Sequence, residues 1–282
     1  MALPTYASPL ERIWHYVFRI LCALIFLYLI APILVIIPLS FNAEPYFTFT
    51  PQMLALDPEA YSLRWYREFF GSEQWLTSFK NSFIIAISAT ILATVLGTVA
   101  ALGLSRREMP WKSAIMGLLI SPMIVPLIIA AAGMYFFYAR FNLTQTFAGI
   151  ILAHAVLGTP FVVITVTATL VGFDRNLIRA AHSLGANETT TFFKVILPLI
   201  APGVISGALF AFVTSFDEVV LVMFLAGPAQ RPVTIQMWTG IREQISPTIL
   251  AVATVLIVIS ILLLGTLEGL RRRNERLRGI KA

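Results

Sequence analysis

Six long apolar segments dominate this sequence, and they restrict it to folds that cross a membrane. A helix needs about 20 mostly apolar residues to cross the hydrocarbon core of a bilayer. The predicted spans cover residues 20–39, 82–104, 114–138, 147–171, 203–225 and 249–270. Only 12% of the residues are charged, whereas soluble domains carry about 25%. We therefore predict an all-α membrane protein with six transmembrane helices.

Lysine and arginine residues are distributed unevenly between the two sides of the predicted membrane. If the N-terminus lies inside, fourteen of them fall in inside segments and five in outside segments, with Lys80 at a membrane edge. Cytoplasmic loops carry the excess of positive residues. We therefore expect both termini in the cytoplasm and a multi-pass protein of the bacterial inner membrane.

The net charge of +6 has the same explanation. The basic tail, residues 269–282, contains no base-reading motif, so no nucleic-acid partner is expected. The longest outer loop, residues 40–80, includes a segment at Tyr61–Phe70 that is predicted to form a short helix anchoring aromatic side chains at the membrane surface.

The inside loop at residues 172–202 predicts two short helices joined by a tight turn. Leu177, Ala180, Ala181 and Leu184 recur at i, i+3, i+4 and i+7, which places them on one apolar helix face. Gly185 follows where a helix end favours a left-handed residue. This face either receives another protein or packs on the chain's own bundle, and periodicity alone favours neither.

A second helix is predicted after Gly185. Asn187 is placed to cap it, with Glu188 in its positively polarised first turn. Pro198 is expected to end this helix, and Pro202 to lie in the first turn of the fifth span.

The same loop closely resembles the "EAA" coupling loop of inner-membrane permease subunits of binding-protein-dependent ABC importers. The matching positions, in order and spacing, are Ala180, Ala181, Gly185, Ala186, Phe192, Leu197, Pro198 and Pro202. The resemblance covers roughly residues 77–268. The chain departs from the family pattern at its Glu position, which holds Arg179 here and reverses the charge.

This resemblance implies a type I ABC importer transmembrane domain at 77–268, which includes the coupling loop 172–202. Residues 1–76 then form the N-terminal tail, the first helix and the outer loop. It implies a permease that forms half of a translocation pathway and docks on an ATP-binding subunit dimer. The residues implied in coupling are Arg179, Ala180, Ala181, Leu184, Gly185, Ala186 and Glu188. A second homologous permease, an extracytoplasmic substrate-binding protein and membrane lipid are the other implied partners.

Two further segments resemble the second permease of spermidine/putrescine-type systems. These are the stretch from His154 to Pro160 and the stretch Ser215-Phe-Asp-Glu in span five. The resemblance implies a polyamine substrate and a heterodimer of permeases. Other substrates of such importers remain alternatives, namely 4-aminobutyrate, opines, iron or a phosphonate.

Asp217 and Glu218 interrupt the fifth span. A carboxylate facing lipid at the bilayer centre costs about 2.5–3.5 kcal/mol on insertion scales. We assign Asp217, Glu218, Phe216 and Ser215 to the substrate pathway, with Asp217 attracting a cation; the alternative is that Asp217 pairs with Arg231 or Arg242. His154, inside span four, is expected to form a helix–helix hydrogen bond.

Prolines within the spans are expected to kink them, because proline lacks the backbone donor and its ring clashes with the preceding turn. The predicted kinks lie at Pro122 and Pro126 in span three and at Pro160 in span four.

No energy-converting or catalytic motif is visible. The chain has no Gly-x4-Gly-Lys-Ser/Thr loop, no metal-spaced cluster and no Gly-x-Ser-x-Gly elbow. We expect a non-enzyme without a cofactor or metal of its own, whose partner ATPase binds ATP and Mg. The alternatives are a secondary transporter, or a membrane enzyme or scaffold.

Overall fold

The computed structural model describes residues 8–106, 108–243 and 245–277, with side chains at 263, 264 and 266–277 outside the description. The side chains of the predicted basic tail therefore lie outside the described residues. Every regular element in the described ranges is a helix, and one isolated antiparallel bridge pairs Asn42 with Tyr61. The all-helical prediction is confirmed.

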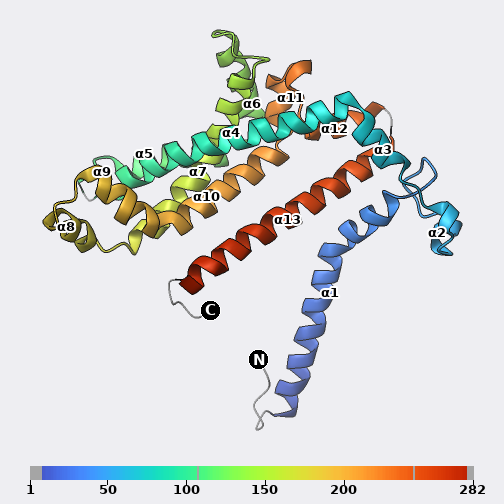
Figure 1. Ribbon diagram of the computed structural model, residues 1–282, viewed down its shortest axis with the longest axis horizontal. Helices are drawn as coiled ribbons and strands as arrows, with labels where there is room; N and C mark the ends of the chain where they lie inside the picture. The colour runs from blue at the N-terminus through green and yellow to red at the C-terminus, as the bar shows by residue number, and fades with distance from the viewer. Residues whose placement is uncertain (1–7, 107, 244, 278–282) are drawn as a thin grey trace. The chain divides into compact units, whose positions relative to one another are not determined.

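The chain divides into two compact units, one of residues 1–72 and 240–282 and the other of residues 73–239. Figure 1 shows their helices. The first unit contains α1 (Pro9–Leu39), α2 (Pro51–Leu54), η1 (Pro58–Ala60), α3 (Arg64–Gly71) and α13 (Thr248–Leu277). Within it, α13 packs against α1 and α3. Trp65 and Phe69 of α3 are buried, and Trp65 Nε1 donates to the Asn42 carbonyl at 2.7 Å.

The helix predicted at Tyr61–Phe70 forms as α3. Trp65 and Phe69 are buried inside the unit, whereas Phe70 is 58% exposed, so anchoring at the membrane surface stays a prediction. The buried indole needs a hydrogen-bond partner, and the Asn42 carbonyl supplies it.

The second unit is built on α4 (Glu73–Leu104), α7 (Phe147–Val171) and α10 (Leu197–Asp217), which pack side by side (Figure 1). Small residues allow the close approach. A methyl group on Gly97 of α4 would lie 2.6 Å from Val162 Cβ of α7, and one on Gly207 of α10 would lie 2.7 Å from Val162 Cα. Such close helix packing through glycine is typical of membrane bundles.

Shorter helices complete the second unit. α5 (Lys112–Ile124) and α11 (Val220–Leu225) pack on α7, and α6 (Leu127–Ala139) packs on α11. After α11, η3 (Pro228–Gln230) leads to α12 (Val233–Glu243), which crosses the unit boundary. The connector between α7 and α10 contains α8 (Asn176–Ser183), α9 (Glu188–Thr191) and the π-helical η2 (Phe192–Ile196).

The predicted third span is not one straight helix. α5 and α6 meet at a bend of 103°, at Val125 and Pro126. Val125 has extended backbone angles, as expected for a residue that precedes proline. The interruption expected at Pro126 is confirmed, whereas Pro122 lies inside α5 and Pro160 inside an unbroken α7. Kinks at these two prolines stay predictions.

The fifth span differs from its predicted bounds. Helical structure runs continuously from Glu188 to Asp217 and stops there, instead of covering 203–225. Pro198 does not end the preceding helix, because it stands in the first turn of α10, where no backbone donor is needed, after a widened π turn. Pro202 is consequently inside α10 rather than in its first turn.

In the described part of the chain, four helical runs are long and apolar enough to cross a membrane, namely α1, α4, α7 and Glu188–Asp217. The bent pair α5 and α6 makes a fifth if it counts as one span. In α13 the apolar part within the described side chains, Thr248–Leu262, is shorter than these. The count of six spans and their orientation therefore stay predictions.

Candidate functional site

The connector after α7 forms the helix–turn–helix that its sequence predicts. At the end of α8, Ala186 N–H donates to the Ala181 carbonyl at 3.0 Å and Gly185 N–H donates to the His182 carbonyl at 2.9 Å. This pair of bonds is the Schellman motif, and it requires a left-handed residue. Gly185 supplies it with a φ of +82°. The predicted role of this glycine is confirmed.

The second helix of the connector is also capped as expected. Asn187 Oδ1 accepts from Thr190 N–H at 2.8 Å, and Glu188 lies in the first turn of α9. Glu188 Oε1 lies 3.6 Å from His182 Nε2, so a charged pair joins α8 and α9 when the histidine is protonated. Their side chains are 89% and 39% exposed, and an exposed pair of this kind contributes little stability.

The apolar face of α8 is mostly uncovered. Leu184 is 88% exposed and Leu177 is 42% exposed, whereas Ala181 is buried and only 9% exposed. Within its unit, α8 therefore does not use this face to pack on the bundle. Of the two interpretations of this face, the structure supports availability to another protein.

Arg179, at the position where the family pattern has Glu, is exposed on α8. Its carbonyl accepts from Ser183 Oγ at 3.0 Å, and its guanidinium forms no ion pair with any described residue. The charge reversal therefore has no compensating partner within the described parts of the chain.

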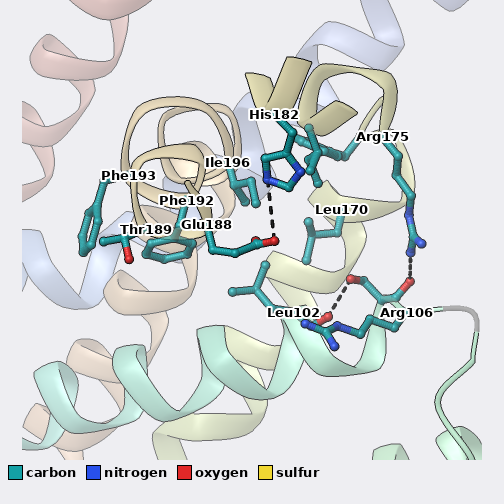
Figure 2. A pocket seen from close by; sticks show the side chains of 13 residues that line it. Leu102, Arg106, Leu170, Arg175, His182, Glu188, Thr189, Phe192, Phe193 and Ile196 are labelled. Carbon is teal, nitrogen blue, oxygen red and sulfur yellow. Dashed lines mark hydrogen bonds and ion pairs between the residues drawn. The ribbon is translucent and has the colours of Figure 1, made fainter. Parts of the chain in front are cut away.

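A cavity of about 630 Å³ lies beside the connector (Figure 2). Its wall comes from the end of α4, the end of α7 and the helices α8, α9 and η2. The Arg175 guanidinium donates to the Ser105 carbonyl and so joins the connector to the end of α4. Arg106 also lines the cavity. Sequence analysis did not find this cavity, because its wall is assembled from segments far apart in the chain.

The pathway candidates lie at the other end of α10. The helix stops at Asp217, Glu218 is extended, and α11 begins at Val220. Glu218 is buried, with 8% of its surface exposed. Its Oε1 accepts from Leu221 N–H at 2.9 Å, so it caps the start of α11. The prediction of one continuous helix through these carboxylates is therefore wrong, since Glu218 supplies the hydrogen bond that starts a new helix.

Ser215 and Glu218 face the inside of the unit, whereas Asp217 is exposed. Ser215 Oγ lies 2.8 Å from His154 Nδ1, which joins α10 to α7 and confirms the helix–helix hydrogen bond expected for His154. Phe216 is half-buried and packs edge-to-face on Phe83 and stacked on Phe212. The pathway role of the four residues stays a prediction.

Arg231 and Arg242 are the alternative partners for Asp217. Among the described residues of its own unit, Asp217 forms no ion pair with Arg231. Arg231 Nη1 instead donates to Gln236 Oε1 at 3.3 Å. Arg242, the other alternative, belongs to the other unit.

Comparison with solved structures shows the fold. The chain matches a bacterial ABC transporter involved in import of the acidic polysaccharide alginate with a TM-score of 0.74, over 93% of this chain and 99% of that one, at 15% identity. A second structure, the alginate ABC transporter in complex with an alginate pentasaccharide-bound periplasmic protein, gives a TM-score of 0.63 over 90% of this chain and 93% of that one, at 15% identity.

Sequence comparison shows the family. The chain is 31% identical over 251 residues to the spermidine/putrescine transport system permease protein PotC of Haemophilus influenzae, covering 89% of this chain and 95% of that one. It is 28% identical to the putrescine transport system permease protein PotI of Escherichia coli, covering 90% of this chain and 88% of that one. Residues 93–276 match the model of the binding-protein-dependent transport system inner membrane component. The chain therefore belongs to the family of inner-membrane components of binding-protein-dependent transport systems, the permeases of ABC importers.

Proposed function

We propose that this permease is one half of the membrane channel of an ATP-driven importer, and that α8 with its following turn receives the motion of an ATP-binding subunit dimer. A second homologous permease completes the channel, and an extracytoplasmic binding protein delivers the substrate. ATP and Mg bind to the ATPase partner, so this chain is not itself catalytic.

The exposed side chain of Leu184 is the observation that carries this proposal. A leucine that is 88% exposed at a helix end is costly to keep in water and favourable to cover. Burying such a side chain contributes about 1.5–3 kcal/mol. The Schellman turn at Gly185 holds this leucine in place, so a partner meets an ordered surface rather than a loose loop.

We further propose a polyamine as the substrate. The relatives PotC and PotI are named for transport of spermidine and putrescine. Asp217 supports the same substrate class, since an exposed carboxylate at the end of α10 attracts a multiply charged cation.

Co-purification of the ATP-binding subunit with a Leu184→Asp variant tests the coupling surface. Replacing a leucine that the docked ATPase would cover by a carboxylate removes about 2 kcal/mol of apolar burial from the complex, so we expect at least tenfold weaker capture of the ATPase. Stimulation of ATP hydrolysis by the substrate-loaded binding protein is expected to fall in parallel.

Leu54→Asp is the matched control, because Leu54 is 72% exposed in α2, outside the connector. This variant is expected to capture the ATPase normally. A Leu184→Asp complex with normal capture and full stimulation of ATP hydrolysis would show that this surface does not dock the ATPase.

A further inference from the structure

We propose that the cavity beside the connector binds the headgroup of an acidic phospholipid. The cavity of about 630 Å³ is of the size that holds small-molecule ligands. Its wall combines cationic and apolar side chains, which suits a ligand with an anionic head and an apolar body.

Two arginines line the cavity, Arg106 and Arg175, and each lies just beyond a helix end, where the headgroup layer of a membrane is expected. Arg106 follows α4, which ends at Leu104, and Arg175 follows α7, which ends at Val171. Both helices are long and apolar enough to span a bilayer. Side chains just beyond the ends of such helices lie at the depth of lipid phosphates, and basic pockets between transmembrane helices at this depth bind acidic lipids.

The charges that line the cavity favour an anion. Arg175 uses part of its guanidinium on the Ser105 carbonyl, and an arginine has five N–H donors in all. Arg106 forms no ion pair with any residue in the described parts of the chain. Glu188 is the one carboxylate among the described residues of the wall, and it lies against His182 at 3.6 Å. Two permanent cations therefore face a single carboxylate that already has a partner.

The rest of the cavity wall favours a lipid over a soluble phosphate as the ligand. Leu102, Leu170, Phe173, Phe192 and Ile196 are half-buried side chains that line the cavity together with the arginines. Figure 2 shows the arginines at one end of the cavity and Phe193 at the other. A free phosphate would leave this apolar surface uncovered, whereas the glycerol and upper acyl chains of a phospholipid would cover it.

Such a lipid would contact both the connector and the ends of the long helices. The cavity is lined by Ile178 and His182 of α8, by Glu188 and Thr189 of α9 and by the ends of α4 and α7. The bound headgroup would thus join the spans to the helices of the connector, and it would do so whichever protein docks on the opposite, exposed face of α8.

Native mass spectrometry of the purified full-length chain tests the proposal. The probes are dioleoyl phosphatidylglycerol and, as a neutral lipid of equal chain length, dioleoyl phosphatidylcholine. We expect the wild type to prefer phosphatidylglycerol, and Arg106→Gln with Arg175→Gln to lower its affinity about tenfold. The double variant Arg106→Lys with Arg175→Lys keeps both charges and should retain most of the binding, which separates loss of the site from loss of folding.

Arg67→Gln with Arg140→Gln is the matched control, since both of these arginines are exposed and lie outside the cavity. This pair should bind phosphatidylglycerol like the wild type. Unchanged phosphatidylglycerol binding in the Arg106→Gln, Arg175→Gln variant overturns the proposal. Full displacement of the lipid by millimolar inorganic phosphate, or by the ATP-binding subunit in the assembled complex, also overturns it, in favour of a free anion or an acidic protein surface as the occupant.

Discussion

Two neighbouring carboxylates show how far individual residues can be predicted from this sequence. Adjacent positions on a helix differ by about 100°, so the sequence predicts that Asp217 and Glu218 point in different directions. Which of them is exposed depends on the break after Asp217, and hydropathy gives no signal for that break. The structure makes Glu218 a buried helix cap and leaves Asp217 exposed.

Removing the Asp217 charge is expected to impair polyamine uptake. Asp217→Asn keeps the shape of the side chain and loses the attraction for a cation, so we expect about tenfold slower uptake of spermidine by membrane vesicles containing the full transporter. Glu59→Gln is the matched control, because Glu59 is an exposed carboxylate in η1, outside the predicted pathway residues. Equal uptake by Asp217→Asn and the wild type, at equal expression, would remove Asp217 from the pathway.

The helices were predicted well where periodicity and apolar length decide their bounds. α7 has the predicted bounds, Phe147–Val171, and the turn at Gly185 has its predicted conformation. The predicted helix stop at Pro198 is wrong, because the π turn before this proline lets the helix continue into α10. Such a turn depends on packing, which no local pattern reveals.

Close packing between α7 and α10 makes Gly207 intolerant of a side chain. A methyl group there would lie 2.7 Å from Val162 Cα, which is backbone and cannot move alone. Overpacking of this kind costs about 1–3 kcal/mol. We therefore expect Gly207→Ala to lower the thermal unfolding temperature of the purified protein by several degrees.

Gly133→Ala serves as the control for this packing prediction, because no atom lies within 4 Å of the added methyl group. It should leave the unfolding temperature unchanged or raise it slightly, since alanine favours helix by about 1 kcal/mol over glycine. If both substitutions have the same effect, the contact at Val162 does not limit the approach of the two helices.

At the scale of the whole molecule, composition and charge predicted an all-helical inner-membrane protein, and the structure and the family confirm this. The cavity beside the connector could not be predicted from the sequence, because residues near 102–106, 170–178 and 182–196 meet only in the folded chain. The proposed function assigns ATP binding to a partner subunit, in keeping with a sequence that has no Gly-x4-Gly-Lys-Ser/Thr loop.

Reconstitution therefore distinguishes this importer from a secondary transporter. The purified chain alone, in liposomes with a proton or sodium gradient, is expected to accumulate no radiolabelled spermidine above protein-free liposomes. Adding the companion permease, the ATP-binding subunit, the binding protein and ATP should produce uptake, and replacing ATP by a non-hydrolysable analogue should abolish it. Residues 93–276 match the inner membrane component of binding-protein-dependent transport systems, so under the proposed function the isolated chain has neither the delivery step nor the energy source. Gradient-driven uptake by the isolated chain would contradict this assignment, because neither step would then require a partner.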